Sequence, residues 1–293
     1  MNVPSSDSSV LIVGCGDIGL RVARLESSDG ATVYGLARSV DKADCLESEG
    51  VVPVMGDLDD PASLQGLNAA DCLLYYFAPP PPVGETDTRI AALLEVLKSP
   101  NVPRRVVLIS TSGVYGDCGG EWVDEDRPPK PRTDRARRRL DAENRLRIWA
   151  KEQGVVIVIL RVPGIYGPGR LPVDRLRRTV PVVRPEEAPI SNRIHADDLA
   201  RICRAAGRVE PVSGVYNVSD GDPTSMTDYF YRVADHLALP RPRAISMEQA
   251  RRELSPGILS FLEESRRIDN RRMLRELKVA LRFPDLNSGL DGC

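Results

Sequence analysis

Near the start of the sequence, an apolar run at residues 10–13 breaks into closely spaced glycines and then resumes with a helical pattern. In such a turn the first glycine allows a tight reversal, the second lets backbone N–H groups approach a phosphate, and the third lets the helix pack closely on the strand. The helix N-terminus attracts an anion. The pattern predicts a pyrophosphate site, with a merely tight structural turn as the alternative. Its candidate cofactor-binding residues are Gly14, Gly16, Asp17, Ile18 and Gly19.

The second apolar run, residues 32–37, ends in Arg38 and Ser39. A site for NAD usually carries an acidic residue about 20 positions after the glycines, where it binds the ribose 2′-hydroxyl. A guanidinium at that place suits a 2′-phosphate instead, because it has a permanent charge and forked donors. We therefore expect NADP, with NAD as the second choice. A solvated arginine at a strand end is the alternative interpretation.

Two further strand ends supply cofactor candidates. Asp57 and Leu58 follow the apolar residues 51–56, where a carboxylate accepts a hydrogen bond from an adenine amino group or caps the next helix. Ala78 ends another apolar run, and four prolines after it force the chain out of the sheet. We assign these three residues to the cofactor because open α/β sheets bind ligands at the carboxyl ends of their strands.

Three hydroxyl side chains, those of Ser110, Thr111 and Ser112, follow the apolar run at residues 105–109. At the carboxyl end of a parallel strand they are placed to bind a substrate hydroxyl or carbonyl beside a nicotinamide. Capping and turn formation are the alternative roles for such hydroxyls.

The elements that position these residues alternate between strand and helix, which requires parallel pairing with right-handed crossovers. We expect an α/β fold, with a doubly wound parallel Rossmann-type sheet and a small C-terminal substrate domain. Residues 8–165, completed by 190–220, would form the dinucleotide-binding domain, and residues 166–189 and 221–293 the smaller substrate-binding domain. Strands are expected at 10–13, 32–37, 51–56, 72–78, 105–109, 155–161 and 214–218, and helices at 20–27, 41–49, 86–99, 198–206, 225–239 and 246–254, with 171–189 irregular.

Composition and charge limit the classes of partner and site that we expect. A formal net charge of −2 over 293 residues gives no reason to expect nucleic acid or a membrane surface. No apolar run reaches the length of a membrane span, and residues 1–7 lack a basic-then-apolar signal, so we expect a cytoplasmic protein. The six cysteines form no C-x-x-C pair and there are two histidines, so neither a metal site nor a disulfide framework is expected. The sequence leaves open whether the chain forms a homodimer.

Five segments in order carry a family resemblance: residues 14–19, 110–116, 161–170, 192–200 and 215–218. With them the chain resembles the extended and atypical short-chain dehydrogenase/reductase proteins, the NAD(P)-dependent epimerase/dehydratase group, over almost its whole length. The glycine spacing is similar to that of the atypical branch. The resemblance implies an oxidoreductase or epimerase that acts on a small, sugar-like carbonyl or hydroxyl substrate.

The resemblance also implies roles for single residues. Thr111 would hydrogen-bond the substrate oxygen, and Tyr115 would stand in as a proton donor. For both Tyr115 and Tyr166, the alternative to a proton-donor role is a structural role in a turn. Arg193 would face an anionic group or pair with Asp197 or Asp198, and His195 would be a packed structural histidine. The implied sites are thus Thr111 and Tyr115 for catalysis, Pro163 for the cofactor, and Ser112, Tyr166 and Arg193 for the substrate.

One departure from the family pattern concerns its acid/base pair, a Tyr followed four residues later by a Lys. Counting back from Ala142 and Glu143 places Arg135 and Arg139 at those positions. A guanidinium stays protonated near neutrality and cannot serve as the base. Arg139 would hold a ribose or an anion, or the arginine run would be a solvated helix face. The alternative function is therefore a non-catalytic NADP-binding protein that controls an interaction.

Overall fold

The computed structural model describes residues 9–293 and is built on a seven-stranded sheet in which all neighbouring strands pair in parallel. The strand order is β12-β7-β5-β4-β1-β2-β3. This confirms the predicted doubly wound fold. Residues 1–7, where the sequence lacks a signal, and residue 8, where the predicted domain begins, lie outside the described part. The strands are β1 (Ser9–Val13), β2 (Thr32–Ala37), β3 (Val52–Met55), β4 (Leu73–Tyr76), β5 (Arg105–Thr111), β7 (Val156–Val162) and β12 (Gly214–Asn217).

Strand β1 shows why the sheet needs a layer on each face. All five of its residues are buried, and successive side chains of a strand point to opposite faces. Val10 and Ile12 belong to one hydrophobic cluster, and Leu11 and Val13 belong to another. An apolar strand of this kind is stable only between two layers of helices.

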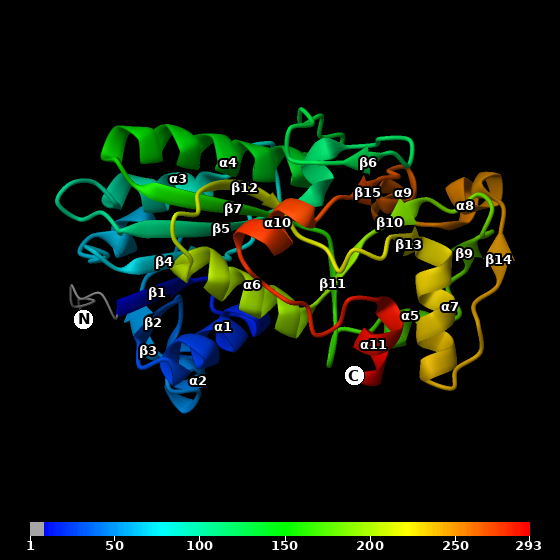
Figure 1. Ribbon diagram of the computed structural model, residues 1–293, viewed down its shortest axis with the longest axis horizontal. Helices are drawn as coiled ribbons and strands as arrows, with labels where there is room; N and C mark the ends of the chain where they lie inside the picture. Colours follow the sequence, from blue (N-terminus) through cyan, green and yellow to red (C-terminus); the bar gives the residue numbers. More distant parts are fainter. Residues whose placement is uncertain (1–8) are drawn as a thin grey trace.

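Helices α1, α2, α6 and α10 supply the first cluster, and α3 and α4 supply the second, so they cover opposite faces of the sheet (Figure 1). Their apolar residues recur at helical spacing, as in Ile90, Leu93 and Leu94 of α3. The bounds are α1 (Asp17–Ser28), α2 (Val40–Ser48), α3 (Thr88–Val96), α4 (Asp134–Gln153), α6 (Ala196–Arg208) and α10 (Arg271–Glu276).

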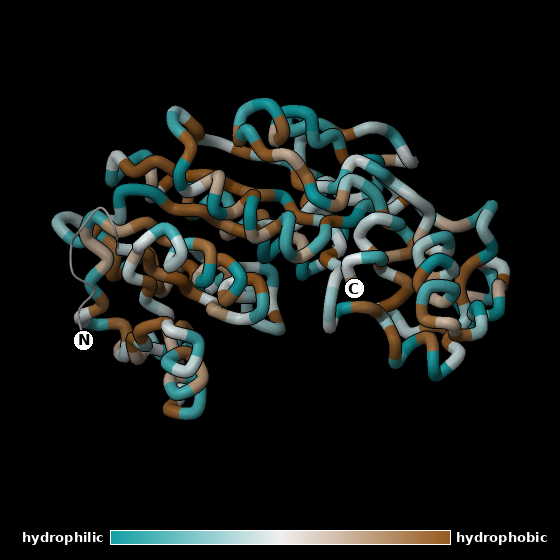
Figure 2. The backbone as a smooth tube through the Cα atoms, turned by 60° about the horizontal axis from the view of Figure 1, so that its bottom comes forward, coloured by the Kyte–Doolittle hydropathy of each residue, from teal (hydrophilic) through white to brown (hydrophobic). Residues whose placement is uncertain are grey.

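The remaining elements gather mainly beyond the carboxyl ends of the strands, around three smaller hydrophobic clusters (Figures 1 and 2). In Figure 2 apolar stretches run through the central strands and the interior of this smaller part, and polar ones mark the outer loops. The elements are η1 (Pro61–Leu64), η2 (Ser112–Tyr115), β6 (Trp122–Val123), β8 (Gly164–Tyr166), α5 (Val173–Arg177), β9 (Val182–Val183), β10 (Ile190–Ser191), β11 (Arg193–His195), β13 (Thr224–Ser225), α7 (Met226–His236), β14 (Ala244–Ile245), α8 (Met247–Glu253), α9 (Pro256–Leu262), β15 (Arg267–Ile268) and α11 (Leu286–Asp291).

The structure adds elements that the sequence analysis does not predict. Residues 171–189, expected to be irregular, contain α5 and β9; β9 is a strand because it pairs with β14, a partner far along the chain. The helix predicted at 246–254 is present as α8, and Pro256 after it begins a further helix, α9, because proline is tolerated in the first helical turn. Within residues 9–293, no helix is both long enough and apolar enough to span a bilayer.

Candidate cofactor and substrate sites

The turn between β1 and α1 requires glycine at position 14. Its φ is +93°, and a Cβ added there would lie 2.3 Å from the backbone nitrogen of Ala78. A Cβ on Gly19 would lie 3.0 Å from the carbonyl oxygen of Gly14. The first glycine thus lets the turn press against the end of β4, and the last lets α1 pack closely on the turn.

Gly16 is different, because a Cβ added there meets no heavy atom within 4 Å. Gly16 caps α1 without a side chain, so no side chain occupies the N–H groups of the first turn. These groups face a cavity of about 710 Å³. Open space beside unpaired N–H groups fits the pyrophosphate of a dinucleotide.

Most of the residues predicted to bind the cofactor line this cavity. Ser39 does not: its hydroxyl caps α2 by accepting from the Lys42 N–H at 3.3 Å. The alternative role of Asp57 as a helix cap falls instead to Asp60, which accepts from the Ala62 N–H at 3.2 Å. The predicted residues on the wall are Gly14, Gly16, Asp17, Ile18, Gly19, Arg38, Asp57, Leu58 and Ala78.

Besides Arg38, four cations line the cavity: Lys42, Arg89, Arg139 and Arg170. The sequence analysis gives Arg139 a candidate role in holding a ribose or an anion, but it does not single out the other three as cofactor residues. Arg89 is paired with Asp59 at 2.6 Å. Arg38 and Lys42 have no carboxylate partner among residues 9–293. Lys42 lies in the first turn of α2, just after the strand end at Arg38 and the cap Ser39, and this place beside a strand end is the signal that could have indicated it.

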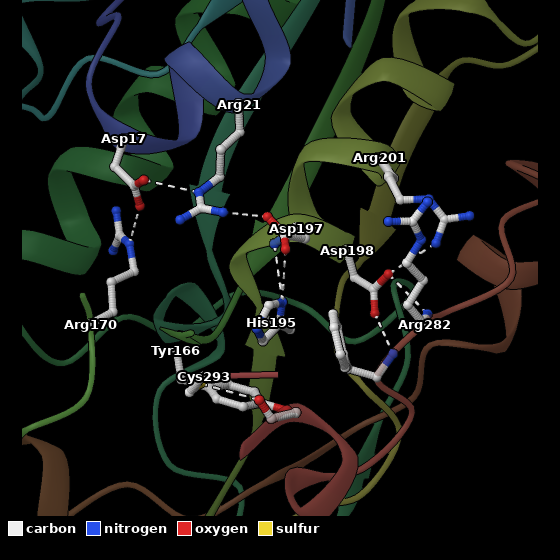
Figure 3. Close-up of polar contacts among 12 residues, drawn as sticks. Asp17, Arg21, Tyr166, Arg170, His195, Asp197, Asp198, Arg201, Arg282 and Cys293 are labelled. Atoms are coloured by element: carbon white, nitrogen blue, oxygen red, sulfur yellow. Dashed lines mark hydrogen bonds and ion pairs between the residues drawn. The ribbon is translucent and has the colours of Figure 1, made fainter. Parts of the chain in front are cut away.

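Asp17 and Arg170 meet at the mouth of the same cavity. Asp17 pairs with Arg170 and with Arg21 at 2.9 Å, and Arg21 also pairs with Asp197 (Figure 3). Partial burial opposes ionisation of Asp17, but hydrogen bonds from both guanidinium groups hold the pKa of its carboxyl below the usual value. The loop after β8 is therefore fastened to the first turn of α1.

Helix α4 directs both of its unusual arginines into the cleft. Arg139 lines the cofactor cavity, where its Nη1 donates to the carbonyl oxygen of Ala78 at 3.1 Å. Arg135 lines a second cavity and lies 4.2 Å from the ring centroid of Phe261. Burial lowers the pKa of both guanidinium groups. A solvated helix face therefore does not describe Arg139, which is half-buried, whereas Arg135 is exposed to solvent although it lines the second cavity.

The second cavity has a volume of about 800 Å³ and includes Thr111, Ser112, Pro163 and Arg193. The Oγ1 of Thr111 accepts from the Gly113 N–H at 3.1 Å, which leaves the hydroxyl proton free to be donated. Pro163 lies in this wall, although the sequence analysis assigns it to the cofactor. Ile165 lines both cavities, so they are adjacent parts of one cleft.

The two candidate tyrosines line neither cavity. The buried Tyr115 donates to Asn217 Oδ1 at 2.8 Å, and burial raises its pKa to about 12. The buried Tyr166 donates to the carbonyl oxygen of Asp285 at 3.2 Å, and burial raises its pKa well above the usual value. A proton-donor role stays a prediction for each, while these contacts are typical of structural tyrosines.

Arg193 has neither of the acidic partners that the alternative interpretation gives it. Asp197 pairs with Arg21, and Asp198 pairs with Arg201 at 3.1 Å (Figure 3). The Arg193 guanidinium instead lies 4.2 Å from the ring centroid of Tyr229. The buried His195 accepts from the Asp197 N–H through Nδ1 at 3.2 Å and so caps α6.

Comparisons with known proteins give a consistent result. Residues 10–219 match the model of the NAD dependent epimerase/dehydratase family. A conserved protein of unknown function from Silicibacter pomeroyi is similar in structure, with 30% identity, a TM-score of 0.82 and 97% of each chain covered. UDP-glucuronic acid 4-epimerase from Bacillus cereus, solved with UDP-glucuronic acid and NAD, has 20% identity, a TM-score of 0.74 and 97% of each chain covered. The curated proteins contain no sequence that matches the chain.

Proposed function

Because the chain belongs to the NAD dependent epimerase/dehydratase family, we propose that it binds NADP and acts as an NAD(P)-dependent oxidoreductase or epimerase on a small, sugar-like hydroxyl or carbonyl compound. The observation that carries the proposal is the shared wall at Ile165, which joins the cavity of the glycine turn to the cavity of Thr111. When bound, the nicotinamide cofactor supplies the hydride acceptor or donor.

The proposed preference for NADP over NAD rests on two cationic side chains of the cofactor cavity. Arg38 and Lys42 present two cations without carboxylate partners to one wall of the cofactor cavity. A ribose 2′-phosphate would complement both of them, whereas a 2′-hydroxyl would leave both cations unpaired. The Bacillus cereus epimerase was solved with NAD, so the preference for NADP is proposed for this chain from Arg38 and Lys42 alone.

Thr111 is the proposed catalytic residue. Its Oγ1 already accepts a hydrogen bond from Gly113, so its hydroxyl donates to the substrate oxygen and polarises it. Ser112 and Arg193 orient the substrate from the same cavity. Arg135 and Arg139 do not replace a tyrosine as base, which leaves the proton to water or to a distant tyrosine and makes the turnover slow.

The domain division is part of the proposal. Residues 8–165 with 190–220 would hold the cofactor, and residues 166–189 with 221–293 would cover the substrate. The separate hydrophobic clusters around α7 and α8 support a distinct smaller unit. Within residues 221–293, however, Met273 and Leu277 belong to the cluster of the large sheet, so α10 extends the cofactor-binding part.

The test begins with calorimetric titration of NADP and NAD, followed by absorbance at 340 nm with a panel of sugars, nucleotide sugars and hydroxy acids. We expect the chain to bind NADP and to reduce it slowly with at least one compound of the panel, and we expect Thr111→Val to abolish this reduction. Ser260→Ala, a second hydroxyl in the wall of the substrate cavity, is the matched control. Absence of NADP and NAD binding would overturn the proposal.

A second function is favoured by Arg135 and Arg139, because they occupy the positions of the family's acid/base pair. A protein that binds NADP without hydride transfer, and so controls an interaction, would show the same cofactor affinity. It would show no turnover dependent on Thr111 with any compound in the panel.

A further inference from the structure

The charges of the substrate cavity are unbalanced. Four arginines and a single carboxylate, that of Glu264, line its wall. Arg266 pairs with Glu264 at 2.8 Å and so accounts for that negative charge. Three positive charges remain, from Arg135, Arg175 and Arg193.

These three arginines have no carboxylate within ion-pair distance in the described part of the chain. Nε of Arg175 is buried without a hydrogen-bond partner. Burial lowers the pKa of all three guanidinium groups, which still remain charged near neutrality. Arg175 and Arg193 are half-buried, whereas Arg135 is exposed. Because desolvating an unpaired charge costs free energy, an anionic ligand that pairs with Arg175 and Arg193 would be bound favourably, and Arg135 would attract a second anionic group by its charge.

Aromatic rings hold the guanidinium groups at two places in the cavity. Arg175 lies 4.2 Å from the ring centroid of Phe230, and Arg193 lies 4.2 Å from that of Tyr229. The two rings are themselves only 5.5 Å apart. Stacking fixes the planes of both guanidinium groups. Nη1 of Arg193 donates to the carbonyl oxygen of Asn192 at 2.8 Å, and the remaining donors of the two arginines make them the candidate for one anion position.

Arg135 forms the other position, beside the hydroxyl cluster. It stacks on Phe261 of α9, and its neighbour Ala136 lies against the turn after Thr111, where a Cβ on Gly113 would be 3.8 Å from the Cβ of Ala136. Glu264 also lines this cavity, and its buried Oε1 has no hydrogen-bond partner among residues 9–293.

We infer that this cavity binds a small hydroxylated molecule with two anionic groups, phosphate or carboxylate, one held by Arg175 and Arg193 and the other held by Arg135 next to Thr111. The inference rests on the proposed function, because it takes this cavity as the substrate site. An anionic group next to Thr111 lies at the reacting end of the substrate. The arginine at the place of the family's tyrosine then has a binding role.

The experiment uses the full chain saturated with NADP, so that pyrophosphate cannot occupy the glycine turn. Pyrophosphate, succinate and the neutral polyol sorbitol are titrated calorimetrically. Arg175→Gln and Arg135→Gln are compared with Arg177→Gln, an exposed arginine of the same helix α5 that does not line the cavity. Circular dichroism verifies that each variant is folded.

We expect saturable binding of one or both anions and none of sorbitol. Arg175→Gln and Arg135→Gln should each weaken the anion Kd by about 10- to 100-fold, the scale of a charge-assisted hydrogen bond, and Arg177→Gln should change it less than about twofold. Tighter binding of pyrophosphate assigns phosphate groups to the substrate, and tighter binding of succinate assigns carboxylates.

Two outcomes would overturn the inference: no saturable anion binding by the NADP-loaded protein, or equal anion affinity in Arg175→Gln and Arg177→Gln. The preceding NADP titration distinguishes failure of this inference from failure of the proposed function. Failure to bind NADP counts against the proposed function, whereas NADP binding without anion binding counts against this inference alone.

Discussion

Arg170 and Asp17 form an ion pair although 153 residues separate them in the sequence. Both line the cofactor cavity, one from the loop after β8 and the other from the first turn of α1 (Figure 3). The pair closes one side of the place proposed for the pyrophosphate. It also neutralises a carboxylate that would otherwise repel that anion.

Arg170→Gln should therefore weaken NADP binding. Among residues 9–293, the variant leaves Asp17 with Arg21 as its single cationic partner, and it removes a cation from the cavity wall. Because the pair is partly exposed, we expect a Kd increase of about 2- to 5-fold, or up to about 1 kcal/mol. Fluorescence titration of NADPH measures it. The double variant Asp17→Asn/Arg170→Gln should recover most of the affinity, and a double variant no better than the single one would contradict this account.

The two glycines of the turn should respond in opposite ways to a side chain. Gly16→Val meets no protein atom within 4 Å at the added Cβ, so the fold should survive while NADP binding is lost. Gly14→Ala places its Cβ 2.3 Å from Ala78 N at a φ of +93°, so the free energy of unfolding should fall by more than about 3 kcal/mol. Thermal unfolding and NADP titration of both variants separate the effects. Full NADP affinity in folded Gly16→Val would contradict the dinucleotide site.

Much of the large sheet follows from local pattern. The sequence predicts the strand at 32–37 with the bounds that β2 has, because the run is apolar and ends at polar residues. It places the start of α1 at residue 20, whereas α1 begins at Asp17, because glycines in the turn interrupt the apolar pattern. Elements whose stability comes from distant partners, such as β9 with β14, leave no local signal.

Arg38 should set the preference between cofactors. With Lys42 it lines the cavity, and a charge-assisted hydrogen bond to a 2′-phosphate contributes about 1–3 kcal/mol. We expect NADP to bind more tightly than NAD, and Arg38→Gln to narrow the difference by that amount. Arg251→Gln, an exposed residue of α8, is the control. Equal affinity of the unmodified chain for NADP and NAD would refute the assignment.

Asp220 should make stability depend on pH. Its side chain is buried, its Oδ1 accepts from the Asp222 N–H at 3.1 Å, and its Oδ2 has no hydrogen-bond partner in the part of the chain that the structure describes. Burial raises the pKa of this carboxyl to about 8, above the unfolded value near 4. The folded state then retains a proton that the unfolded state loses, so the stability contribution is complete below about pH 4 and is lost as pH rises towards 8.

The matched variant is Asp220→Asn, which keeps the shape and removes the titration. Urea unfolding between pH 5 and pH 8 should show the unmodified chain losing stability relative to Asp220→Asn, by up to about 1.4 kcal/mol for each pH unit. Parallel pH profiles for the two proteins would show that this carboxyl does not titrate in that range.

Only part of the candidate site could be predicted from the sequence. Thr111 and the glycines follow from spacing, because strand ends and turns have local signatures. Arg175 does not, since its importance comes from stacking on Phe230 without a carboxylate partner in the described part of the chain. Glu264 does not either, since its importance comes from its ion pair with Arg266. Pairing and burial of a charge depend on the tertiary structure, and no local pattern predicts them.

Restoring the family's acid/base pair is the most direct test of the chemistry. Arg135 and Arg139 both face the cleft, one in each cavity, so Arg135→Tyr with Arg139→Lys places a phenol on the wall that includes Thr111. A positioned general acid/base contributes about 10²- to 10⁴-fold to rate. At a saturating concentration of carbonyl substrate, the kcat of NADPH oxidation should rise within that range, whereas KM should also rise because the charge of Arg135 is lost.

The control keeps the lysine and changes the phenol: Arg135→Phe with Arg139→Lys has the same ring without a proton to exchange. It should show no gain, and Thr111→Val added to the restored pair should remove the gain. An equal rise with phenylalanine would mean that removal of the Arg135 charge, not proton transfer, accelerates the reaction. Brisk turnover by the unmodified chain that is insensitive to Thr111→Val would refute the site and redirect the proton-transfer role to Tyr115 or Tyr166.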